Sequence, residues 1–346
     1  MMTPRLFKQL GRLGLAALTL ASASLLADDT SPQAREHWHQ AIEQRYGALN
    51  DASERLEASA ERFCNEASDS HRQRLTRDWL EAWQAWQAVR FVDFGPIEQN
   101  SRAWQMQFWP DRKNLVGRKM QAWLAREEAP TAEQIAEDSV AAQGFPALEY
   151  LLFDDSMQGT DALAQPVACG LMSAIATHLA DTAGALQRDW QRFGDHYRGT
   201  QSYTTATLHG ALLALETLET KRLGEPMGLT GGSANGYLAE AWRSERSVRL
   251  IEASLRGLED TFLPGLRTLL NARGKPDLAA EFGAGLDKAR QGAAEMAAGV
   301  APALDDRDRF RALQGLYVQV GQLRHRLETI GHELGMVRGF NSSDGD

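Results

Sequence analysis

The sequence is poor in cysteine and lacks an excess of positive charge. Only two of its 346 residues are cysteines, Cys64 and Cys169, and no Cys-x-x-Cys pair occurs, which excludes thiolate zinc and iron–sulfur sites. With 46 acidic against 37 basic side chains, the chain has no global positive field for a phosphate backbone, so nucleic acid is not an expected partner. Apolar residues make up 43% of the chain, enough for one large or two ordinary cores.

Segments with the two-residue period of a β-strand are also missing. Ala, Leu, Glu, Gln and Arg are frequent, and apolar residues recur at helical spacing. We therefore predict an all-α protein without a substantial sheet. A polar loop at 193–202 divides it into two helical-bundle halves, residues 28–198 and 199–346, and the second half ends in a polar tail.

The apolar run Leu13–Leu26 is too short to span a bilayer. It follows three basic residues and contains small residues at a suitable cleavage position, which is the pattern of a signal peptide. We predict that residues 1–27 are a targeting segment, cleaved after Ala23 or Ala27. The mature protein is then expected to be periplasmic, not membrane-spanning and more acidic than the precursor.

Two cysteines in an exported chain favour a disulfide bond between Cys64 and Cys169. The alternative is a pair of free thiols that act as small buried apolar side chains. A bond would close a long loop and stabilise the folded chain strongly in the chain-entropy model.

A predicted helix from Arg72 to Phe91 places three tryptophans and Arg90 on one face. The indoles indicate a core layer, and Arg90 takes its charge toward the interior, where it needs a carboxylate. The segment Asp93-Phe94-Gly95-Pro96 then ends the helix. The tryptophans on this face are Trp79, Trp83 and Trp86.

A second informative segment is the predicted helix Gly144–Phe153, in which Pro146 suits the first turn. Glu149 lies in its apolar stripe, so its carboxylate must be paired, bound to a metal or protonated. It is a candidate for a functional site or for a structural ion pair. If Arg90 lies beside it, the pKa of Glu149 should fall in spite of burial.

Several segments occur in the order expected for the imelysin-like family of exported bacterial proteins, which the chain resembles over most of its mature length. The family was first described as insulin-cleaving metallopeptidases and is often associated with iron acquisition. The resemblance rests on the tryptophan-rich helix ending at Pro96, the 144–153 helix, Lys221-Arg222-Leu223-Gly224-Glu225-Pro226, Trp242-Arg243-Ser244 and the tail 339–346.

The family signature Gly-x-His-x-x-Glu places two metal ligands on one helix face. Here Gly144 and Glu149 match, but Pro146 stands at the histidine position and has no donor atom. No His-Glu-x-x-His replaces it, and no two of the eight histidines stand four residues apart on a predicted helix. Metallopeptidase chemistry is therefore the minority hypothesis.

The resemblance implies a binding component for iron uptake or handling, with a polar site where the two halves meet. Its ligand would be iron or an iron chelate, and its partner would be another exported or outer-membrane uptake component. Any metal cofactor would be iron or zinc, with Glu149 as the metal ligand. A metal-dependent peptidase is one alternative. The other is a purely structural Arg90, Asp93 and Glu149 network. The candidate binding residues are Arg90, Asp93, Gly144, Pro146, Glu149 and Glu225.

Overall fold

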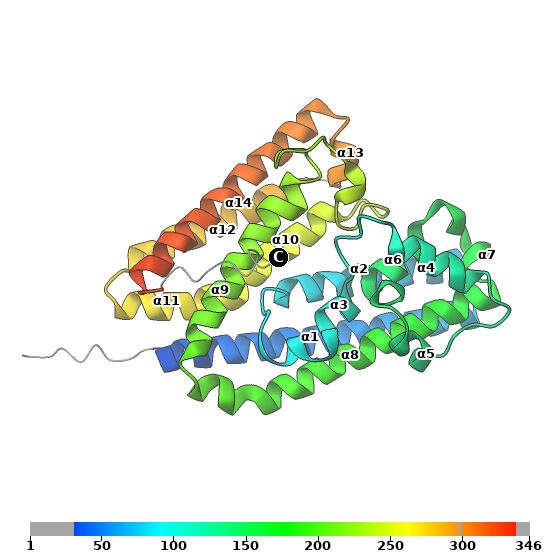
Figure 1. The fold of residues 1–346 in the computed structure, drawn as a ribbon, viewed down its shortest axis with the longest axis horizontal. Coiled ribbons are helices and arrows are strands. Elements are labelled where there is room, and N and C mark those ends of the chain that lie inside the picture. The colour runs from blue at the N-terminus through cyan, green and yellow to red at the C-terminus, as the bar shows by residue number, and fades with distance from the viewer. Residues whose placement is uncertain (1–30, 297–298, 337–346) are drawn as a thin grey trace, which may run out of the picture.

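The computed structural model describes residues 31–296 and 299–336, and these form helices without any β-strand (Figure 1). The predicted all-α class is thus confirmed. The predicted signal peptide and the polar tail after residue 338 lie outside the described residues. None of the described helices is long and apolar enough to cross a membrane.

Two long helices, α1 (Ser31–Asn65) and α8 (Pro166–Gly199), run side by side in opposite directions along one edge of the molecule (Figure 1). Apolar residues of α1 recur every three or four positions and are fully buried, so the amphipathic pattern explains the packing. A disulfide bond joins Cys64 at the end of α1 to Cys169 at the start of α8, with 5.6 Å between the Cα atoms. The predicted cysteine pairing is confirmed.

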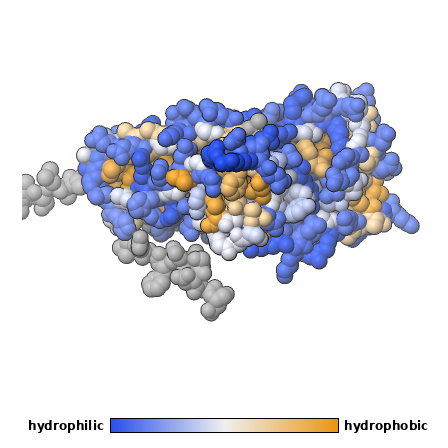
Figure 2. Space-filling model, turned by 90° about the horizontal axis from the view of Figure 1, so that it is seen from above, coloured by the Kyte–Doolittle hydropathy of each residue, from blue (hydrophilic) through white to orange (hydrophobic). Residues whose placement is uncertain are grey.

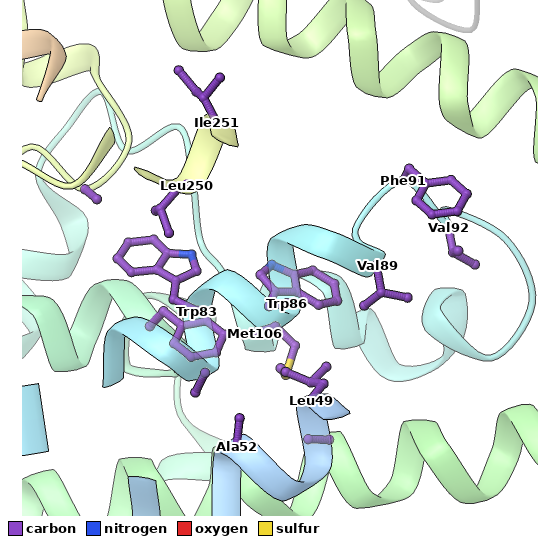
Figure 3. Packing of buried hydrophobic residues seen from close by; sticks show 14 of the residues in the cluster. Leu49, Ala52, Trp83, Trp86, Val89, Phe91, Val92, Met106, Leu250 and Ile251 are labelled. Atoms are coloured by element: carbon purple, nitrogen blue, oxygen red, sulfur yellow. The ribbon is translucent and has the colours of Figure 1, made fainter. Parts of the chain in front are cut away.

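Helix α2 (Asp69–Val89) begins after Ser68, whose hydroxyl accepts a hydrogen bond from the backbone N–H of His71. Its three predicted core tryptophans are fully buried, and the Trp83 ring stacks on Phe145 with 5.6 Å between centroids. Figure 3 shows Trp83 and Trp86 between side chains of α1 below and α10 above. The tryptophan face is therefore the core layer that the spacing predicts.

Short helices connect α2 to α8 and surround the tryptophan layer. They are η1 (Gly95–Ser101), α3 (Arg102–Met106), α4 (Leu115–Leu124), α5 (Ala132–Glu137), η2 (Val140–Ala142), α6 (Gly144–Phe153), η3 (Asp155–Met157) and α7 (Thr160–Leu163).

The remaining helices form a second layer, in which α10 packs on α2 and α11 packs on α1 (Figure 1). The predicted boundary at residue 198 falls at the end of α8, and the division into two halves stays a prediction. The elements of this layer are α9 (Ser202–Thr217), η4 (Leu218–Gly224), η5 (Gly236–Leu238), α10 (Ser247–Gly257), η6 (Leu258–Phe262), α11 (Leu263–Ala272), α12 (Pro276–Glu295), α13 (Val300–Ala303) and α14 (Arg307–Glu333).

Buried apolar side chains of both layers form one continuous cluster. On the face shown in Figure 2, hydrophilic residues cover most of the surface and hydrophobic residues gather in small patches between them. Five large apolar side chains among the described residues are exposed, and three of them, Trp104, Leu213 and Tyr237, line cavities. The cavities are therefore places where the protein leaves apolar surface accessible.

Candidate functional site

Four of the six predicted binding residues line two cavities that share no lining residue. The Glu149 cavity has a volume of about 310 Å³ and includes Pro146 and Glu149 in its wall. The Arg222 cavity has a volume of about 440 Å³ and includes Arg90 and Asp93. The structure thus does not bring these four residues into one cleft, and residues from both predicted halves line each cavity.

Helix α6, which carries Pro146 and Glu149, begins at Gly144, where φ is +70°. A Cβ atom at this position would lie 2.2 Å from the backbone oxygen of Met106, so only glycine fits here. Pro146 follows in the first turn, where its missing N–H is not needed, and Glu149 lies one turn further on. Gly144 therefore positions the helix, whereas Pro146 and Glu149 face the cavity.

The Glu149 side chain is only 3% exposed and makes its hydrogen bonds to a single residue of the other layer. The backbone N–H of Ser244 donates to Glu149 Oε1 at 2.9 Å, and the Ser244 hydroxyl donates to the same oxygen at 2.7 Å. Burial raises the pKa of Glu149 to about 7, against the opposing effects of the Ser244 hydrogen bonds and of Arg243. This carboxyl therefore exchanges its proton near neutral pH.

The expectation that Arg90 would lower the pKa of Glu149 is wrong. Arg90 Nη1 donates to Glu240 Oε1 at 2.9 Å, and the Glu149 carboxyl has Ser244 as its partner instead. Desolvation consequently dominates, and the pKa of Glu149 rises. Asp93 is exposed in the other cavity, so the three residues do not form the network considered above.

Two arginines bring positive charge to the wall of the Glu149 cavity. Arg243 pairs with Asp154 at 3.2 Å and donates to Asn114 Oδ1 at 2.9 Å. Arg112, which is exposed, donates to Glu225 at 2.7 Å. The predicted residue Glu225 thus does not line the cavity but holds Arg112 at its wall.

Aromatic rings complete the same wall. The Arg243 guanidinium lies over the Trp242 ring at 4.3 Å from its centroid, and the Tyr237 ring packs edge-on against Trp242 at 4.7 Å. Trp83, Phe108 and Trp109 line the cavity from the other layer. Flat rings beside arginines and carboxyls suit an organic ligand that carries polar groups.

Glu240 is the centre of a buried ionic network between the two cavities. Its carboxylate forms an ion pair with Arg222 and accepts hydrogen bonds from Arg90 at 2.9 Å, from Gln87 at 3.1 Å and from Gln107. Arg222 is 3% exposed and Glu240 only 1%. The need of Arg90 for a carboxylate was correctly predicted, but its partner was not.

No role was predicted from the sequence for Arg222, Glu240, Arg243 or Ser244. Three of these residues lie in the segments 221–226 and 242–244 that carry the family resemblance, which was the available signal. Glu240 follows a loop rich in glycine and serine, where no periodicity marks a buried position.

The donor groups do not fit a resident metal ion. Among residues 31–296 and 299–336, no group of three or more His, Cys, Asp or Glu side chains is placed to hold one. Pro146 has no donor atom, and one oxygen of Glu149 already accepts two hydrogen bonds. Glu149 could contribute to metal binding only if the ligand brought most of the donors itself.

The chain is thus an all-helical protein with cavities lined from two helical layers. The family model for imelysin matches residues 42–327, so the chain belongs to the imelysin family. No curated protein matches the sequence.

Two solved structures have similar folds. An imelysin-like protein from Psychrobacter arcticum 273-4 has a TM-score of 0.78 and 22% sequence identity, covering 90% of this chain and 97% of its own. A candidate iron-regulated protein A precursor from Parabacteroides distasonis ATCC 8503 has a TM-score of 0.64 and 11% identity, covering 87% of this chain and 95% of its own. At these identities the likeness concerns the fold.

Proposed function

We propose that this protein is an exported binding component in iron uptake or handling and that the Glu149 cavity is its ligand site. The observation that carries the proposal is the composition of this cavity: it combines arginines, carboxyls and aromatic rings from both layers without a group of metal-donor residues. The signal-peptide pattern of residues 1–27 and the Cys64–Cys169 bond support export. The family membership and the iron-regulated protein with a similar fold support the link to iron.

The ligand that suits this cavity best is an iron chelate rather than a bare ion. A chelate supplies its own oxygen donors, so the protein needs only to bind the chelating molecule. Arg112 and Arg243 can donate hydrogen bonds to its carboxylates, and the rings of Trp109 and Trp242 can cover its apolar parts. The Glu149 proton, which is exchanged near neutral pH, makes binding sensitive to pH.

A partner that delivers or receives the chelate is part of this proposal. The cavity lies between two layers, and Tyr237 at its wall is 70% exposed, which leaves an aromatic surface accessible beside the ligand. Another exported or outer-membrane uptake component would contact the protein there.

The test is a calorimetric titration of the chain beginning at residue 28 with ferric citrate, citrate alone and zinc chloride, after elemental analysis of the purified protein. We expect ferric citrate to bind and zinc to bind at least about tenfold more weakly. Arg112→Gln should weaken ferric citrate binding at least about tenfold, because it removes a cavity cation.

Arg311→Gln is the matched control, because Arg311 is also an exposed arginine with one carboxylate partner but lies on α14, outside the cavity wall. Its ferric citrate affinity should equal that of the unaltered protein. Absence of ferric citrate binding, or an equal loss in both variants, would contradict the proposal.

A further inference from the structure

The Arg222 cavity is open to solvent at one end and is larger than the Glu149 cavity. Arg90 comes from the end of α2, and Asp93 and Glu98 follow it in the chain. Leu213 of α9 and Arg222 of η4 line it from the other layer. Its volume of about 440 Å³ lies within the range of sites for small organic molecules.

Positive charge is concentrated at the buried end of this cavity. Burial, helped by the nearby charge of Arg90, lowers the pKa of Arg222 to about 10, so Arg222 still carries its charge at neutral pH. Their shared ion-pair partner is Glu240, so two guanidinium groups face one carboxylate. An additional anion at this end would balance the second guanidinium.

Hydrogen-bond donors are also available at the buried end. Arg222 Nη1 donates to Gln87 Oε1 at 3.1 Å and to Ser254 Oγ at 2.7 Å, but its buried Nε has no hydrogen-bond partner among the described residues. The Arg90 side chain is 26% exposed, and among the described residues it donates a hydrogen bond from Nη1, to Glu240. A ligand carboxylate beside Arg90 could accept from the accessible N–H groups of that guanidinium, while the buried Arg222 contributes its charge.

The exposed end of the cavity has the opposite charge and an apolar surface. Asp93 and Glu98 are exposed there, and two acidic groups repel a ligand with several negative charges. Trp104 and Leu213 are large apolar side chains that are about half exposed in the same wall. This end therefore favours a ligand whose body is apolar and whose only charge lies deep in the cavity.

Both π-helical segments of the described chain contribute to this wall. Leu218 and Arg222 belong to η4, and Leu258 is the first residue of η6. Because π-helical turns are uncommon and occur frequently at functional sites, their meeting at one cavity is a second, independent indication of binding.

We propose that the Arg222 cavity binds a small monocarboxylate with an apolar body. The carboxylate lies against Arg90 and Arg222, and the apolar body packs along Phe91 and Leu258 toward Trp104 and Leu213 at the exposed end. This site is distinct from the Glu149 cavity, since no residue lines both.

The experiment is a calorimetric titration of the chain beginning at residue 28 with phenylbutyrate, with the uncharged phenylbutyramide and with citrate. We expect phenylbutyrate to bind, and the amide and citrate to bind at least about tenfold more weakly. Equal affinity for the amide would overturn the role of the two arginines, and absence of phenylbutyrate binding would overturn the site.

The location is tested with Leu213→Asp, which adds a third acidic group to the exposed end of the cavity. We expect at least about a tenfold loss of phenylbutyrate affinity. Val318→Asp on α14 is the matched control, because Val318 is also an exposed apolar helix residue but lies outside the cavity wall. Equal affinity in the two variants would overturn the location.

A second variant, Trp104→Ala, keeps the test valid if Leu213→Asp does not fold. Trp104 is about half exposed, and its removal shortens the apolar wall without adding charge. Phenylbutyrate affinity should fall several-fold, while acetate, which lacks the apolar body, should bind both forms equally weakly. Unchanged phenylbutyrate affinity would contradict the proposed position of the apolar body.

Discussion

Ser244 donates two hydrogen bonds to one oxygen of the Glu149 carboxyl, one from its backbone N–H and one from its hydroxyl. This contact joins α6 to the segment between η5 and α10, and thus joins the two layers at the cavity. An amide oxygen can accept the same two hydrogen bonds, whereas only a carboxyl can change its charge. The protonation of Glu149 can therefore be altered by mutation without loss of the contact.

Glu149→Gln should abolish a pH dependence of stability. Because the pKa of Glu149 is raised from its ordinary value of 4.5 to about 7, the unfolded chain loses this proton before the folded chain does. The contribution of protonated Glu149 to the free energy of unfolding is therefore complete below about pH 4.5. It falls as the pH rises to about 7. A pKa shift of this size corresponds to a change of up to about 3 kcal/mol in the free energy of unfolding.

The measurement is urea unfolding of both proteins at several pH values. Glu149→Gln should have nearly the stability of the unaltered protein at acidic pH and exceed it above neutral pH. Glu149→Ala serves as the comparison, because it removes the acceptor of both Ser244 hydrogen bonds and should destabilise at every pH. A Gln variant that is less stable at all pH values would contradict the raised pKa.

Glu240→Gln should destabilise the fold by about 3 to 5 kcal/mol, because it leaves the Arg222 charge buried without its carboxylate partner. Glu225→Gln is the control. Its two partners, Arg112 and Lys221, are both at least half exposed, so its loss should cost about 1 kcal/mol or less. Thermal unfolding of the two variants measures the difference, and equal losses would show that the Glu240 network is not the buried ion pair described above.

Removal of the disulfide by the double substitution Cys64→Ser and Cys169→Ser should cost up to about 4 to 5 kcal/mol in the chain-entropy model. The bond closes a sequence separation of 105 residues, which constrains the unfolded chain strongly. Free-thiol titration in denaturant gives a direct check on the native protein. Two reactive thiols in protein isolated from the periplasm would refute the bond in the cell.

Pro146→His should increase zinc affinity at least about tenfold, because it places an imidazole in the Glu149 cavity, three residues before Glu149, where the resemblance implies a histidine. The titration should be done above pH 7, where Glu149 is ionised. Combining Pro146→His with Glu149→Gln should cancel the increase. If zinc affinity does not change in Pro146→His, the cavity lacks the geometry for a metal held by these two positions.

Helical periodicity predicted much of the fold because it reports which face of a helix is buried. The positions of Trp79, Trp83 and Trp86 in the core follow directly from their spacing. The expected export and the presence of two cysteines were enough to predict the Cys64–Cys169 bond.

Periodicity does not identify the partner of a buried charge. Arg90 pairs with Glu240, which is 150 residues away in the chain and lies in a segment without helical spacing. Arg90, at the end of α2, and Glu149, on α6, line different cavities. Only the packing of the two layers decides such pairings.

The backbone contact at Gly144 has a consequence for how the Glu149 cavity can change. The start of α6 rests on the main chain at Met106, so the close approach of two backbones sets where the helix begins. Residues 146 and 149 can therefore be exchanged while the helix stays in place, and a different set of ligand contacts can be built on the same frame. A substitution of Gly144 would instead shift Pro146 and Glu149 together, and would alter the shape of the cavity without changing its chemistry.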